Sequence, residues 1–146
     1  MKITQKGEYG LHALLELAGR YGEGPLQSAL IAERRRVPVA YLQQIMLSLQ
    51  RAGLVHSERG PRGGHELARP PAEISLLEAI QALEGSTAAA ACMEPGAPTC
   101  AQHDRCVLLP IWREVDEAVQ RILSGVSLAD LVRREREFGS PLMYYI

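Results

Sequence analysis

The spacing of apolar residues along the chain predicts a protein built mainly from helices. In the first helix, leucines recur at helical intervals after Thr4, a residue type that caps helices. A later helix begins at a capping box, Ser75 to Glu78. The expected helices cover about residues 4–21, 27–34, 38–53, 75–83, 106–123 and 127–136. Residues 86–105 lack periodicity and are expected to form a loop, and the tail, residues 139–146, is expected to be mobile.

The most informative stretch is residues 37–67. Pro38 suits the first position of a helix, and Gly53 can end it in a left-handed conformation. The apolar face between them is formed by Val39, Leu42, Ile45, Met46 and Leu49. Two short apolar runs then flank a glycine-rich turn at residues 60–64, which predicts a β-hairpin with a basic tip. A helix followed by a basic hairpin is the recognition helix and wing of a winged helix-turn-helix.

Polar and small residues on the other face of this helix would face a DNA major groove. Arg59 and Arg62 stand in the hairpin turn, where a wing meets phosphates or the minor groove. Three consecutive arginines precede the recognition helix and are interpreted as phosphate contacts, with a solvated helix end as the alternative. The candidate DNA-binding residues are therefore Arg34, Arg35, Arg36, Ala40, Tyr41, Gln43, Gln44, Arg51, Arg59 and Arg62.

Charge and composition change this picture only in detail. The chain has 146 residues, of which 47% are hydrophobic and 23% charged, as in a globular protein. Residues 1–69 carry a net charge of +4 and residues 70–146 a net charge of −5, so the basic half coincides with the predicted winged helix. Without a membrane-length apolar run or a signal peptide, we expect a cytoplasmic protein with no membrane partner.

The long helix expected over residues 106–123 has Trp112 on its apolar face. Such a face needs cover, either from another subunit or from the first helix, and a homodimer is the favoured interpretation. Two-fold dimers match pseudo-palindromic operators in double-stranded DNA. We therefore expect residues 1–71 to form the winged helix-turn-helix and residues 72–146 the cysteine loop and dimerisation region, within a single compact domain.

All three cysteines, Cys92, Cys100 and Cys106, lie in or beside the predicted loop. Three thiolates that converge from a loop indicate a metal or iron–sulfur site, with free or redox-active thiols as the alternative. Zinc would prefer closer pairs of cysteines. His103 lies in the same loop, whereas Glu8 and His12 share a face of the first helix. Taken alone, His12 is more typical of a packed core residue, and Glu8 of a solvated charge.

An enzyme with a cysteine nucleophile and His12 or His103 as its base is not favoured. The sequence has no glycine-rich phosphate loop, paired catalytic carboxylates or HExxH motif.

Several segments resemble the Rrf-two family of winged-helix transcription regulators, of the iron–sulfur cluster regulator and nitric-oxide-sensitive repressor type. The matching segments are residues 1–9 (MKITQKGEY), 41–44 (YLQQ), 53–55 (GLV) and 59–64 (RGPRGG), the three cysteines, and Trp112 with Arg113. The likeness covers residues 1 to about 136. It implies a homodimeric DNA-binding regulator whose cysteines hold a [2Fe–2S] or [4Fe–4S] cluster near the partner's first helix, and which senses redox state, nitric oxide or cluster status.

The resemblance also suggests where a fourth ligand would come from. Cluster-assembly regulators of this family place a histidine ligand three residues after the last cysteine, where this chain has Leu109. A nitric-oxide-sensing branch uses a carboxylate where Glu8 stands, and a redox-sensing branch uses a glutamate and a histidine placed as Glu8 and His12 are. The alternative is a winged-helix regulator without a cluster, which uses the loop for a small ligand or a protein partner.

Overall fold

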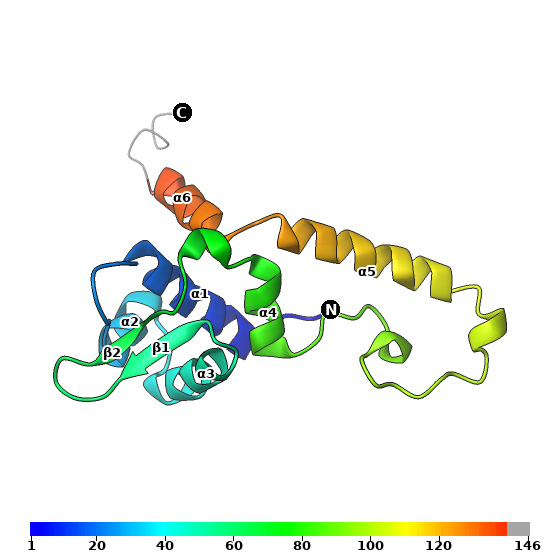
Figure 1. Cartoon of the computed structure of the whole chain (residues 1–146), viewed down its shortest axis with the longest axis horizontal. Coiled ribbons are helices and arrows are strands. Elements are labelled where there is room, and N and C mark those ends of the chain that lie inside the picture. Colours follow the sequence, from blue (N-terminus) through cyan, green and yellow to red (C-terminus); the bar gives the residue numbers. More distant parts are fainter. Residues whose placement is uncertain (140–146) are drawn as a thin grey trace.

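The computed structural model describes residues 1–139, so nearly all of the predicted mobile tail lies outside the described residues. The described part has six α-helices and one two-stranded antiparallel hairpin (Figure 1), as the sequence predicted. The elements are α1 (Gln5–Gly19), α2 (Ser28–Arg35), α3 (Val39–Arg51), β1 (Val55–Glu58), β2 (Gly64–Leu67), α4 (Leu76–Glu84), α5 (Leu109–Ser124) and α6 (Leu128–Phe138). Within residues 1–139, none of the helices is both long and apolar enough to cross a membrane.

Helices α1, α2 and α3 pack around one apolar core. Thr4 caps α1, because its hydroxyl accepts a hydrogen bond from the backbone N–H of Gly7 at 3.2 Å. Most of the apolar positions that predicted α1, α2 and α3 become buried, and Leu14, Ile31, Leu42, Ile45 and Leu49 are all fully inaccessible. Val39 is an exception, because it stands at the first turn of α3 and is 49% exposed. Ile74 and Leu128 complete this core from the later part of the chain.

The wing, residues 55–67, follows α3 directly. Strands β1 and β2 pair from Val55 opposite Leu67 to Glu58 opposite Gly64. The turn requires glycine at position 63, since a Cβ atom there would lie 2.3 Å from the carbonyl oxygen of Glu58. The wing is therefore held beside the recognition helix, as the predicted winged helix-turn-helix requires.

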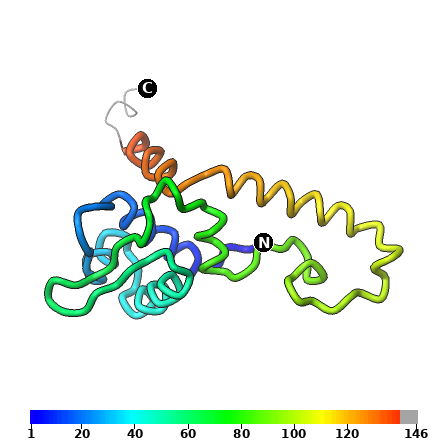
Figure 2. The backbone as a smooth tube through the Cα atoms, viewed as in Figure 1, coloured from blue at the N-terminus to red at the C-terminus, as the bar shows by residue number. Residues whose placement is uncertain are grey.

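The second half of the chain extends away from this body. Figures 1 and 2 show the cysteine loop, residues 86–108, and α5 as an arm that projects from α4, while α6 returns to the body beside α1. Helix α5 begins at Leu109 and not at Cys106, because Cys106 has an extended backbone and Pro110 occupies the first turn. The cysteines consequently all precede the helix.

Candidate DNA interface and cysteine pocket

The recognition helix α3 buries one face and exposes the other. The buried face consists of Leu42, Ile45, Met46 and Leu49. The exposed residues include all five sequence-predicted DNA contacts on this helix, Ala40, Tyr41, Gln43, Gln44 and Arg51. Burial of the apolar face fixes the rotation of the helix, so these side chains must point outward.

Contacts from α1 fix the recognition helix along its length. The ring of Tyr41 meets Tyr9 edge to face, with 5.8 Å between the ring centroids and 76° between the planes. Farther along, the ammonium group of Lys6 donates a hydrogen bond to the hydroxyl of Ser48 at 3.2 Å. Helix α1 therefore holds α3 near both its start and its end.

A groove of about 450 Å³ separates α3 from the wing. Gln43 and Leu47 line it from the helix, and Glu58 and Arg59 line it from the wing. Arg62 is exposed in the turn of the wing. The structure thus brings residues of the predicted base-reading helix and of the predicted phosphate-binding wing to one surface.

The three arginines before α3 have different environments. Arg34 is 45% exposed and pairs with Glu16, whereas Arg36 is exposed with a left-handed backbone, φ 53°. Arg35 is only 15% exposed, and its guanidinium pairs with Glu16 on α1 and Glu135 on α6. Arg35 therefore links α2 to α1 and α6. Its two carboxylate partners would compete with the predicted phosphate contact.

Glu16 is a buried ion-pair partner of two candidate arginines, and the helical pattern did not predict it. It is buried, with 9% of its surface exposed, and accepts ion pairs from Arg20, Arg34 and Arg35. A single charge inside the apolar stripe of the first helix was the available signal, because a buried carboxylate needs cationic partners.

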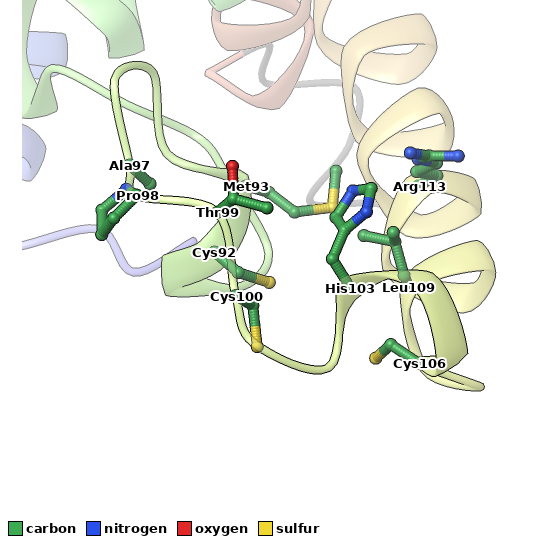
Figure 3. A pocket seen from close by; sticks show the side chains of 10 residues that line it. All are labelled: Cys92, Met93, Ala97, Pro98, Thr99, Cys100, His103, Cys106, Leu109 and Arg113. Atoms are coloured by element: carbon green, nitrogen blue, oxygen red, sulfur yellow. The ribbon is translucent and has the colours of Figure 1, made fainter.

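The three cysteines line a single pocket of about 240 Å³ with His103, Leu109 and Arg113. Cys92 and Cys100 are exposed and Cys106 is partly buried, and all three are free thiols. In Figure 3 the sulfur atoms of Cys92, Cys100 and Cys106 point in different directions, and the ring of His103 points away from all three. The three cysteines therefore share one pocket, and their convergence as a set of ligands stays a prediction.

Glu8 and His12 lie in a different place. Both are exposed on α1, at the edge of a groove of about 460 Å³ whose floor is formed by leucines of α1, α4 and α6. The interpretation of His12 as a packed core histidine is therefore wrong, because its side chain is on the helix face that points outward. Within one chain, neither residue lines the cysteine pocket.

The donors in the pocket suit an iron–sulfur cluster by chemistry. Thiolates are the usual ligands of such clusters, and here three of them share one pocket in a loop. Within residues 1–139, no three side chains of the metal-binding types are already close enough to hold one ion. Three thiolates also leave one ligand position of a four-ligand cluster to be filled from elsewhere.

Helix α5 carries an apolar face that the described residues leave largely uncovered. None of its residues is buried, and Ile111, Val115 and Ile122 are 51%, 39% and 62% exposed. Trp112, Val119 and Leu123 are partly buried. The helix packs against α4, and Figure 1 shows most of it extending beyond the body.

Comparison with known proteins agrees with this geometry. The profile of the Rrf2 family (Rrf-two above), described as an iron-dependent transcriptional regulator, matches residues 3–134. The HTH-type transcriptional regulator IscR of Xenorhabdus nematophila is 37% identical over 135 residues, which cover 92% of this chain and 81% of that protein. IscR of Aliivibrio salmonicida is 38% identical over 132 residues, covering 90% of this chain and 77% of that protein.

Solved structures show the same likeness. IscR of T. potens has a TM-score of 0.77 at 33% identity and covers 99% of this chain and 97% of its own. CymR of B. subtilis, titled the global cysteine regulator, has a TM-score of 0.75 at 34% identity, covering 92% of this chain and 98% of its own. Both the predicted winged-helix fold and the predicted regulator class are confirmed. The chain belongs to the Rrf2 family of DNA-binding transcriptional regulators, which are not enzymes.

Proposed function

We propose that this protein is a homodimeric regulator that binds a pseudo-palindromic DNA operator and holds an iron–sulfur cluster through which it senses redox state, nitric oxide or cluster status. The observation that carries the proposal is the pocket shared by Cys92, Cys100 and Cys106 in a chain whose recognition helix is exposed. A regulator of transcription works where the chromosome is, so we place it in the cytoplasm. Residues 1–71 would read DNA and residues 72–146 would sense and dimerise.

In the proposed DNA complex, α3 enters the major groove and the wing lies on the flanking backbone. Gln43 and Gln44 are exposed on α3, and a glutamine amide can pair with two atoms of an adenine edge. Arg59 and Arg62 on the wing, with Arg34 and Arg36 before α3, would neutralise phosphates. These contacts would have different roles: side chains on α3 would select the DNA sequence, and the arginines would supply affinity that depends on salt concentration.

The proposed dimer is formed by α5. Its apolar face is exposed on an arm that the other described residues leave largely uncovered. A second copy can cover it by the same face, which a two-fold axis allows. The dimer would place the cysteine loop of one subunit near α1 of the other.

The fourth cluster ligand is proposed to come from that neighbouring α1. Glu8 and His12 are exposed on one face of the helix and, in their own subunit, do not reach the cysteine pocket. Glu8 or His12 of the partner subunit could therefore complete the three thiolates across the interface, since iron accepts carboxylate and imidazole ligands. His103 is the competing ligand, because it lines the pocket in the same chain.

Ligation across the interface would also explain sensing. Losing the cluster would free α1 from the partner's loop and change the spacing of the two recognition helices, which must match the two half-sites. Within one subunit, two contacts hold the start of the loop: the terminal amine of Met1 donates to the carbonyl of Ala88 at 3.4 Å, and the backbone N–H of Ala89 donates to Asp116 on α5 at 2.7 Å.

The experiment is anaerobic purification of the dimer, followed by iron and sulfide analysis and visible absorption spectra. Glu8→Ala, His12→Ala and His103→Ala variants are compared with Glu23→Ala, an exposed carboxylate in the turn after α1. The proposal expects a changed spectrum in Glu8→Ala or His12→Ala and none in Glu23→Ala. If only His103→Ala changes the spectrum, the loop completes its own site.

The alternative is a regulator without a cluster, whose pocket takes a small ligand or a protein partner. Two observations support this alternative: no three side chains of the metal-binding types within residues 1–139 are placed to hold one ion, and the fold is similar to that of CymR, a cysteine regulator. This alternative would be selected if the protein takes up no iron during anaerobic reconstitution and binds its operator with the same affinity before and after that treatment.

A further inference from the structure

A chain of four polar side chains joins the wing to α2 and α3. The imidazole of His65 on β2 lies with Nε2 2.7 Å from the hydroxyl of Ser28, the first residue of α2. Its Nδ1 atom bonds the hydroxyl of Ser57 on β1. The same hydroxyl accepts a hydrogen bond from the side-chain amide of Gln50 on α3. The side chain of His65 on β2 thus connects to α2 and β1 directly, and to α3 through Ser57.

The amide nitrogen of Gln50 can only donate, so the hydroxyl of Ser57 accepts from it. In neutral His65 one ring nitrogen donates and the other accepts. One tautomer accepts the proton of Ser57 at Nδ1 and donates from Nε2 to Ser28, and the other tautomer reverses both hydrogen bonds. Burial lowers the pKa of His65 below its ordinary value of 6.5, which favours this neutral, one-proton form near neutral pH.

The backbone around His65 holds the wing at the same point. His65 and Leu26 exchange two backbone hydrogen bonds, both 2.8 Å long. Gly64 must be glycine there, since its φ is 148° and a Cβ atom would lie 2.5 Å from the carbonyl oxygen of Leu26. Gln27 donates from its side chain to the carbonyl of Pro61 in the wing turn at 2.9 Å. The strand is therefore fixed to the segment before α2, and the side chain of His65 carries that attachment across to α3.

We propose that His65 is a positioning residue for DNA recognition, which sets the distance between the wing and the recognition helix. It lines the groove that also contains Gln43 and Arg59, so a shift of β2 would move the wing arginines relative to the base-reading residues. His65 need not touch DNA for this role. The inference rests on the proposed contact between the wing and the DNA backbone.

The competing explanation is that His65 only fills space. A phenylalanine at this position would keep a ring of similar size but would lose both hydrogen bonds, whereas a glutamine would keep one donor and one acceptor. Ser28→Ala removes only the far end of the chain, on α2, and leaves the wing sequence unchanged. It is the second variant in case His65→Phe does not fold.

The test uses the intact dimer and one operator fragment, with dissociation constants measured at several salt concentrations. The proteins are wild type, Arg62→Ala, His65→Phe, the double variant, His65→Gln and Ser28→Ala. We expect His65→Phe to weaken binding about tenfold, as for the loss of one or two partly buried hydrogen bonds, with partial recovery in His65→Gln. Arg62→Ala should weaken binding in wild type but by less than about twofold in the His65→Phe background, because the wing is already displaced.

The outcomes separate the two proposals. An Arg62→Ala loss of equal factor in both backgrounds, or wild-type affinity in His65→Phe and Ser28→Ala, overturns the positioning role of His65 alone. Arg62→Ala with unchanged affinity and salt slope in wild type overturns the wing contact itself, and the positioning role with it.

Discussion

Glu84, the last residue of α4, accepts two hydrogen bonds from Thr4, the residue that caps α1. The backbone N–H of Thr4 donates at 2.7 Å and its hydroxyl at 2.8 Å, both to the same carboxylate oxygen. Glu84 lies two residues before the cysteine loop, and Thr4 directly precedes the helix that carries Glu8 and His12. The pair therefore joins the segment that leads into the cysteine loop to α1, the helix proposed to contact the cluster of the partner subunit.

Removing this carboxylate should destabilise the fold. Glu84→Ala is expected to lower the free energy of unfolding by about 1–2 kcal/mol, since it removes two hydrogen bonds to a charged group. Denaturant unfolding measures the change, with Gln81→Ala on the exposed face of the same helix as the control.

A Cβ atom at Gly7 would lie 2.0 Å from the Glu84 oxygen, so Gly7→Ala should destabilise wild type but not the Glu84→Ala variant. Additive effects of the two substitutions would contradict the contact.

Arg36→Gly should raise stability and weaken DNA binding at once. Arg36 has a left-handed backbone, which costs a residue with a side chain about 1 kcal/mol relative to glycine. The free energy of unfolding should therefore rise by up to about 1 kcal/mol, while the lost phosphate contact reduces the salt slope by about one. Arg36→Lys, which keeps both the charge and the strain, is the matched control. Unchanged salt dependence in Arg36→Gly would remove this residue from the DNA interface.

Stability should depend on pH through Glu135. The hydrogen bond from Arg35 is the largest cause that holds the pKa of Glu135 below its ordinary value of 4.5. A lowered folded-state pKa stabilises the protein above pH 4.5, and this contribution is lost as the pH falls through the folded-state value. Glu135→Gln should thus be less stable than wild type at neutral pH, with a difference that disappears on acidification. Glu135 is 44% exposed, so the difference at neutral pH should stay below about 1 kcal/mol.

The matched control for this prediction is Glu137→Gln. Glu137 is exposed on the same helix, and no ion pair is found for it among residues 1–139. An equal pH dependence of the two differences, measured by urea unfolding between neutral pH and about pH 3, would show that Arg35 does not act through Glu135.

The exposed face of α5 should control the oligomeric state. Val115→Glu or Ile122→Glu places a charge in the proposed interface and should convert the dimer to monomers at micromolar concentration. The affinity for the operator should also fall in these variants, because each monomer would then bind only one half-site. Sedimentation velocity measures the mass, and Gln120→Glu, on the opposite face by helical spacing, is the control. A Val115→Glu protein that remains dimeric would move the interface elsewhere.

Base selection should depend on Gln44. Its side chain is exposed on α3, and loss of a two-bond pairing with adenine removes about 1–3 kcal/mol of discrimination. Gln44→Ala should therefore bind the operator and its single-base variants with more similar affinities, at an unchanged salt slope. Competition binding over a set of point-substituted operators checks this. An unaltered preference would exclude Gln44 from base reading.

The sequence alone determined where the helices and the hairpin form, because the signals for them are local. The Thr4 cap, the Ser75 capping box and the glycines of the wing turn each act within a few residues, so they could be recognised without knowing the fold. The periodic leucines likewise gave the buried faces of α1 and α3. Together with the motif around Arg59–Gly64, these signals were enough for the winged-helix fold and the regulator family.

Only the tertiary structure decided which distant side chains meet. Arg35 and Glu135 are 100 residues apart in sequence, and their pairing links α2 to α6 at a residue for which the sequence had indicated only a phosphate contact. Likewise, His65 meets Ser28 and Ser57 only because of the register of β1 with β2 and the position of α2 beside the wing. Such contacts depend on how whole elements pack, and the free energy of that packing comes from the buried apolar core rather than from any short sequence pattern.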